Sequence, residues 1–186
     1  MCYFVPLRMG TKKRFSRPFN TFTCCVGSGM ENHSKYTEGI YYEGKDGSLI
    51  VNMFIPSELN WRSKNVTIRQ ESTFPESDKI NFSIEPKSSA KFVLKIRQPK
   101  WAAGNIVLKV NGSDAKAVKD PAGYWVITRN WKRGDKVEIT APMQLYSESM
   151  PDNPNRIALL YGPLVMAGQL GKERKCPIQS LGQLSS

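Results

Sequence analysis

An alternation of apolar and polar residues with a period of two runs through most of the chain and limits its fold more than any other feature. From Lys45 onward it recurs in short runs rich in Val, Ile, Thr and aromatic residues. These runs are "SLIVNMFI", "NVTIRQES", "KINFSIE", "AKFVLKIR", "NIVLKV", "GYWVITR" and "DKVEITA". Such alternation is typical of β-strands that bury one face.

The segments between these runs carry the residues that turns require. Asn111-Gly112 is the dipeptide preferred in tight hairpins, and "DPAG" and "KRGD" are typical of loops. Pro163 divides the later apolar stretch "RIALLYGPLVMAG", which predicts an edge or a bend there. We therefore predict a mainly β fold, with a two-sheet antiparallel β-sandwich over residues 45–170.

The first 44 residues differ from the rest and predict one helix. Ser28 and Glu31 fit a capping box after a turn at Gly27–Gly29, and Gly44 is a plausible end. We expect a helix over residues 29–43 with Met30, His33, Ile40 and Tyr41 near one face. A single helix cannot bury its apolar face alone. We therefore expect Tyr36, Ile40 and Tyr41 to leave apolar surface exposed and to favour self-association.

The adjacent pair Cys24 and Cys25 is the most unusual local feature. The four cysteines, which also include Cys2 and Cys176, are too unevenly spaced for a disulfide framework, and a bridge between neighbours would strain the peptide. A helix N-terminus favours a thiolate, and two thiolates can hold part of a zinc site, which needs four ligands. His33, Cys2 and Glu31 are candidates for further ligands. The alternative is two buried cysteines acting as small apolar residues.

Net charge and hydropathy limit which kinds of partner the chain is expected to bind. Lys and Arg number 27 against 16 Asp and Glu, a formal net charge of +11, but the basic residues are scattered along the strands. This scatter favours a solvated basic surface over a nucleic-acid site. No apolar run approaches the ~18 residues that a membrane span needs. We therefore expect neither a nucleic-acid nor a membrane partner.

The cysteine segment also supports a resemblance to a known family. "FNTFTCCVGSGMENHSKYTEGIYY" resembles the metal-and-cysteine segment of the β-L-arabinofuranosidases of glycoside hydrolase families 127 and 146. "LKIRQPKWA", "VNG", "GYWVITRNWKRGDKVEI" and "LLYGPLVMAG" are similar to the β-sandwich that follows their (α/α)₆ catalytic barrel. The resemblance covers about residues 1–168. It implies that residues 1–44 are the end of that barrel, followed by the sandwich at 45–170 and a tail at 171–186.

The resemblance implies a retaining hydrolase that releases terminal β-L-arabinofuranose from plant-type glycans outside the cytoplasm, in the periplasm or beyond. Cys24 matches the nucleophile, which also binds Zn²⁺, and Cys25 matches a neighbouring zinc ligand. The remaining cysteine and glutamate ligands and the acid/base glutamate are implied to lie upstream of Met1. We therefore expect the chain alone to be inactive and to bind zinc weakly or not at all.

A stand-alone carbohydrate-binding sandwich is the alternative. It would use exposed tryptophans, for which the candidates are Trp61, Trp101, Trp125 and Trp131.

Overall fold

The computed structural model describes residue 17, residues 24–102 and residues 106–168, with the backbone alone at 24–26. Residues 37–166 form one compact unit, and helix α1 (Cys24–Lys35) belongs to a second. The tail predicted at 171–186 lies outside the described residues. Among the helices of the described part, none combines the length and the apolar character that crossing a membrane demands.

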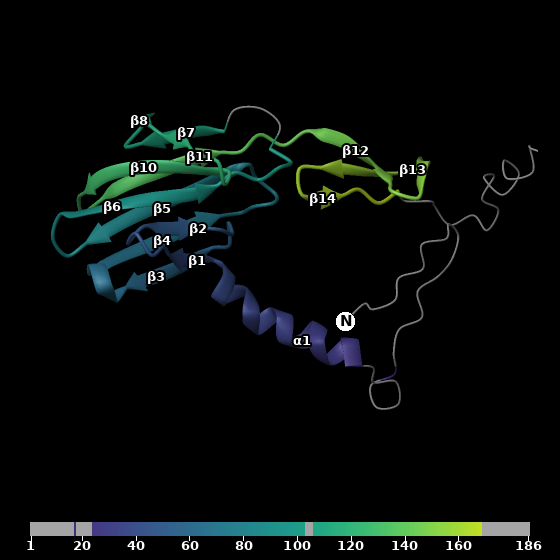
Figure 1. Cartoon of the computed structure of the whole chain (residues 1–186), viewed down its shortest axis with the longest axis horizontal. Coiled ribbons are helices and arrows are strands. Elements are labelled where there is room, and N and C mark those ends of the chain that lie inside the picture. The colour runs from purple at the N-terminus through teal and green to yellow at the C-terminus, as the bar shows by residue number, and fades with distance from the viewer. Residues whose placement is uncertain (1–16, 18–23, 103–105, 169–186) are drawn as a thin grey trace, which may run out of the picture. The chain divides into compact units, whose positions relative to one another are not determined.

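Most of the compact unit consists of two large sheets (Figure 1). In strand order, the first contains β1 (Tyr41–Glu43), β2 (Leu49–Val51), β6 (Ala90–Arg97), β10 (Tyr124–Trp131) and β9 (Val118–Lys119). The second contains β3 (Ser57–Trp61), β4 (Val66–Ser72), β5 (Lys79–Pro86), β11 (Asp135–Thr140), β7 (Val107–Val110) and β8 (Ser113–Asp114). Described neighbours are antiparallel except β2 and β6, which run parallel.

The alternating strands of both large sheets direct their apolar residues into one shared core. In β5, residues 80, 82, 84 and 86 are buried and the residues between them are more exposed, as a period of two requires. The largest fully buried side chains are Trp131 and Phe82, which come from the first and the second sheet. The predicted fold class, an antiparallel β-sandwich preceded by a short helix, is confirmed.

The turns follow the chemistry that the sequence predicts. Asn111 and Gly112 have φ angles of 53° and 77° and join β7 to β8, which are the positive values that a tight hairpin turn demands. Pro163 lies in the turn between β13 (Asn153–Tyr161) and β14 (Leu164–Val165), so the predicted bend is confirmed.

The last described strands correct the prediction of a two-sheet sandwich over residues 45–170. Strand β12 (Leu145–Met150) pairs with β13, and β13 pairs with β14. These strands make a separate three-stranded sheet instead of joining either large sheet. Alternation indicates strands but not which strands pair, so the sequence pattern does not predict this third sheet.

The helix predicted over residues 29–43 is also corrected. Helix α1 begins at Cys24 and ends at Lys35, and the 3₁₀-helix η1 (Tyr36–Gly39) follows. Ser28 is therefore inside the helix and is not its N-cap. The helix ends early because Ile40 is 4% exposed and Tyr41 pairs with Val51 across the first sheet. Strand pairing and burial override the local helical pattern.

Because the helix ends at Lys35, fewer of the predicted apolar residues are exposed than expected. Tyr36 is 47% exposed, as expected, but Ile40 belongs to the core and Tyr41 packs against it. The expectation that Ile40 and Tyr41 are exposed is wrong. Self-association stays a prediction.

Candidate functional site

Helix α1 carries both cysteines of the unusual pair. Cys24 and Cys25 are its first two residues, so they occupy the first turn, where backbone N–H groups lack partners within a helix. The positive end of a helix dipole favours an anion such as a thiolate at this position. The pair thus lies within the helix start, whereas the sequence predicted it just before one.

The same helix separates the pair from the other ligand candidates that it carries. At a rise of ~1.5 Å per residue, His33 is roughly 12 Å along the axis from Cys25, and Glu31 is roughly 9 Å. The His33 ring packs edge-on against Tyr36, with 5.7 Å between ring centroids, at the C-terminal end of the helix. Zinc–ligand bonds are ~2.0–2.3 Å long. This axial separation gives no support to His33 or Glu31 as further zinc ligands, and Cys2 lies outside the described residues.

A metal site needs several ligands that lie close together. Across the side chains of the described residues, no three His, Cys, Asp or Glu residues gather in a way that could hold a metal ion.

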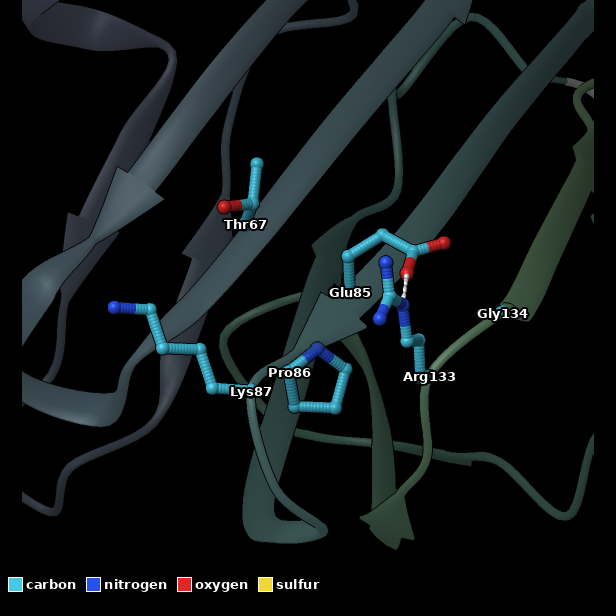
Figure 2. Close-up of a pocket in the computed structure, with 6 residues that line it drawn as sticks. All are labelled: Thr67, Glu85, Pro86, Lys87, Arg133 and Gly134. Atoms are coloured by element: carbon cyan, nitrogen blue, oxygen red, sulfur yellow. Dashed lines mark hydrogen bonds and ion pairs between the residues drawn. The ribbon is translucent and has the colours of Figure 1, made fainter.

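A groove on the second sheet is lined in part by charged residues (Figure 2). It is lined by Thr67, Glu85, Pro86, Lys87, Arg133 and Gly134. Arg133 Nε lies 3.2 Å from Glu85 Oε2, and Figure 2 shows the Lys87 side chain directed away from this pair. The Arg133 side chain is 86% exposed, so the pair is a solvent-screened surface contact. With its only carboxylate paired and no thiol or histidine, the groove offers no catalytic group.

The tryptophans do not form a sugar-binding surface. Trp61 and Trp131 are buried, and Trp101 and Trp125 are partly buried and pack against the core. Trp101 stacks on Phe74 with ring centroids 5.5 Å apart. A carbohydrate platform needs exposed aromatic faces, so the tryptophans give no support to the stand-alone binding module.

Asp135 is the most deeply buried carboxylate of the described residues, at 5% exposed. Burial alone would raise the pKa of its carboxyl. Hydrogen bonds from Asn111 Nδ2 at 2.8 Å, the Lys132 N–H at 2.9 Å and Arg129 Nε at 3.3 Å outweigh burial and hold that pKa below its usual range. A general acid needs a raised pKa, so Asp135 stabilises its turn instead of donating protons.

We expect Asp135→Asn to lower the free energy of unfolding by about 1.5–3 kcal/mol at pH 7, because hydrogen bonds to a charged group are lost. Since the folded pKa is lowered, this contribution is present above the unfolded pKa of about 3.9 and disappears as the pH falls through the folded value. Urea denaturation at pH 7 and pH 3 measures it. The difference in unfolding free energy between variant and native chain should be smaller at pH 3 than at pH 7, and an equal difference at both pH values would contradict this role. The exposed Asp114→Asn is the control.

Comparisons with known proteins agree on one relationship. The sequence profile of the β-L-arabinofuranosidase GH127 middle domain matches residues 48–143, which contain strands β2 to β11. A non-reducing end β-L-arabinofuranosidase of Bifidobacterium longum subsp. longum is 25% identical over 159 residues, covering 78% of this chain and 23% of that protein.

Solved structures give the same result. A GH127 β-L-arabinofuranosidase from Geobacillus stearothermophilus T6 superposes with a TM-score of 0.68 and 27% identity, over 76% of this chain and 23% of that one. A glycoside hydrolase that is 21% identical has a TM-score of 0.70 over 87% of this chain and 28% of its own, and supports the fold alone. The chain thus spans about a quarter of the length of these relatives.

Proposed function

Because the chain belongs to the GH127 β-L-arabinofuranosidase family, whose middle domain it contains, we propose that it forms part of a glycoside hydrolase that releases terminal β-L-arabinofuranose from glycans. The observation that carries this proposal is the match of that domain's profile to strands β2–β11 of the sandwich. The names of the relatives from Bifidobacterium and Geobacillus support the substrate class.

The catalytic role falls to the cysteine pair, which lies at the start of helix α1 and shortly before the matched domain in the chain. We assign Cys24 as the nucleophile and Cys25 as its neighbour in the site. Two features support this assignment: the resemblance of the segment to the family's cysteine segment, and the helix start, which favours a thiolate.

The proposed reaction replaces one of the two carboxylates of ordinary retaining glycosidases with a thiolate. The Cys24 sulfur attacks the anomeric carbon and forms a carbon–sulfur bond while the carbon–oxygen bond to the leaving group breaks. A carboxylic acid gives its proton to the leaving oxygen. A water that has lost a proton to the same carboxylate then breaks the carbon–sulfur bond, which restores the thiolate and retains the configuration.

The described residues fit zinc only in part. Two adjacent thiolates suit Zn²⁺ by their chemistry, but they supply only half of a four-ligand site, and His33 and Glu31 lie roughly 12 Å and 9 Å from Cys25 along the helix axis. In this proposal the missing ligands and the acid/base come from the longer part of the enzyme that the relatives possess.

The chain alone should show no measurable arabinofuranosidase activity and no stoichiometric zinc. Loss of the acid/base step alone typically costs ~10²–10⁴-fold in rate, and a nucleophile without its full ligand set adds to that loss. The test is an assay with an aryl β-L-arabinofuranoside beside metal analysis of the same sample.

Two variants make this test decisive. Turnover that disappears in Cys24→Ser but persists in Cys176→Ser would show that the chain completes its site, for instance between subunits. The proposal that the site needs more chain would then be wrong. If the native chain, Cys24→Ser and Cys176→Ser all show no turnover, the result agrees with the proposal.

A further inference from the structure

The turn between β7 and β8 holds the single Asn–Gly dipeptide of the sequence, Asn111-Gly112. Asparagine is a chemically labile residue, and a following glycine has no Cβ to keep its main-chain nitrogen away from the asparagine side chain. Gly112 has a φ of 77°, and among the described residues only its chain neighbours lie within 4 Å of the position of a Cβ. The turn therefore has room for a ring to close between these two residues and for water to open it.

Two hydrogen bonds hold the Asn111 side chain in the folded chain. Its Nδ2 donates to Asp135 Oδ1 at 2.8 Å, and its Oδ1 accepts the Lys136 N–H at 2.8 Å. The first bond joins an amide to a carboxylate that is 5% exposed, and hydrogen bonds to a charged group are the stronger kind. Ring closure must bring Asn111 Cγ to bonding distance of the Gly112 nitrogen, and we expect both bonds to resist that movement.

We propose that Asn111 is a modification site, which deamidates when the β7–β8 hairpin opens and then cannot rebuild its contact with Asp135. The Gly112 main-chain nitrogen loses its proton and bonds to Asn111 Cγ. The bond from Cγ to Nδ2 breaks, and ammonia leaves with that proton. Water then opens the five-membered imide ring and yields aspartate or isoaspartate. The net reaction consumes one water and releases one ammonia, and it needs neither an oxidant nor an enzyme.

The hairpin is placed where it can open without the rest of the sandwich. Strand β8 is the outermost strand of the second sheet and has only two residues, Ser113 and Asp114. Small edge elements open with a free energy well below that of global unfolding. Opening releases the Asn111 side chain from Asp135 and Lys136. Because ammonia is lost, each reaction is a one-way step, and the modified fraction records how long the hairpin has been open.

The aspartate product replaces a donor with a second carboxylate. The 2.8 Å contact between Asn111 Nδ2 and Asp135 Oδ1 becomes a contact between two carboxylate oxygens, which repel one another in a partly buried site. Asp135 keeps its hydrogen bonds from Arg129 Nε and the Lys132 N–H but loses the third donor. The isoaspartate product lengthens the main chain within a two-residue turn, whose geometry has no place for an extra atom.

Peptide mass spectrometry on the full chain tests where and when the reaction occurs. The chain is incubated at pH 8 and 37 °C with and without guanidinium chloride, and the modified fraction at Asn111 is followed over time. We expect the folded chain to react roughly ten- to a hundredfold more slowly, the factor that corresponds to two hydrogen bonds of which one is to a charged group.

A double-mutant cycle tests the effect of the product. Asn111→Asp should raise the equilibrium constant for unfolding at pH 7 roughly tenfold or more. Asn60→Asp adds the same charge at an exposed residue of β3 in the same sheet and should change it little. In an Asp135→Asn background one carboxylate and one amide remain, so Asn111→Asp should cost clearly less there than in the native chain.

Three results would overturn the proposal. The first is an Asn111 that stays unmodified in guanidinium chloride, and the second is a folded chain that reacts as fast as the unfolded one. The third is an Asn111→Asp substitution that costs nothing, or that costs the same in both backgrounds, because repulsion between the two carboxylates would then play no part. If Asn111→Asp does not fold by circular dichroism, the chain that also carries Asp135→Asn should fold, and its failure to do so would equally contradict the proposal.

Discussion

Trp131→Ala should lower the free energy of unfolding of the sandwich by about 3–5 kcal/mol, the range for large aromatic residues truncated in a core. Trp131 is fully buried, and its ring stacks on Phe92 with centroids 5.5 Å apart. Its Nε1 donates a hydrogen bond to the Phe92 carbonyl at 3.1 Å, and Trp61 packs edge-on against the other ring of this stack. Domains of this size are stable by only ~5–15 kcal/mol, so the variant should be largely destabilised.

Two variants separate packing from hydrogen bonding at this position. Trp131→Phe keeps most of the stack but leaves the Phe92 carbonyl without its donor, which should cost about 1–3 kcal/mol. Val118→Ala, on the exposed edge strand β9, should change little. Urea denaturation followed by circular dichroism measures all three. An unchanged midpoint for Trp131→Ala would show that the core does not close around this ring.

The strands that the sequence predicts well are those with one face buried along their whole length. Strands β4, β5, β6 and β11 alternate between buried and more exposed residues, so burial and pattern coincide. The missed strand β3 reads "SELNW", which is rich in residues that are poor strand formers. It is held by its pairing with β4 at the edge of the second sheet. Which strands pair, including the parallel β2 and β6, is set by tertiary contacts that a local pattern does not contain.

In the candidate site too, the local pattern predicts some features, while others depend on tertiary contacts. The cysteine pair is recognisable from the sequence because two neighbouring thiols before a helical segment are rare in a chain with four cysteines. The sequence leaves open whether His33 joins the pair, because it predicts a helix that begins at residue 29 and not at Cys24. One continuous helix from Cys24 to Lys35 then fixes the axial separation between them. The deeply buried Asp135 was missed, since its environment combines its own β10–β11 hairpin, with Arg129 and Lys132, and the distant Asn111.

The largest effect on activity should come from Cys24 once the rest of the catalytic machinery is supplied. A chimera in which this chain replaces the matching quarter of the Geobacillus enzyme provides that machinery from a relative of the same family. Removing a nucleophile typically costs roughly 10⁴-fold or more in rate. Cys24→Ser in this chimera should reduce turnover by about that factor, because a hydroxyl remains largely protonated where a thiol ionises.

The control in the chimera is a cysteine outside the pair. Cys176→Ser removes a thiol from the same chain and should leave turnover unchanged. Circular dichroism and the sedimentation coefficient establish that each chimera is folded, so that a loss of turnover reports on chemistry.

The turnover of an aryl β-L-arabinofuranoside by the folded chimera, with and without Cys24, tests most directly whether this chain carries the nucleophile of a glycoside hydrolase. We predict that the chimera with Cys24 is active and that Cys24→Ser lowers its turnover by ~10⁴-fold or more. A folded chimera whose turnover is the same with serine at this position would contradict the assignment of Cys24.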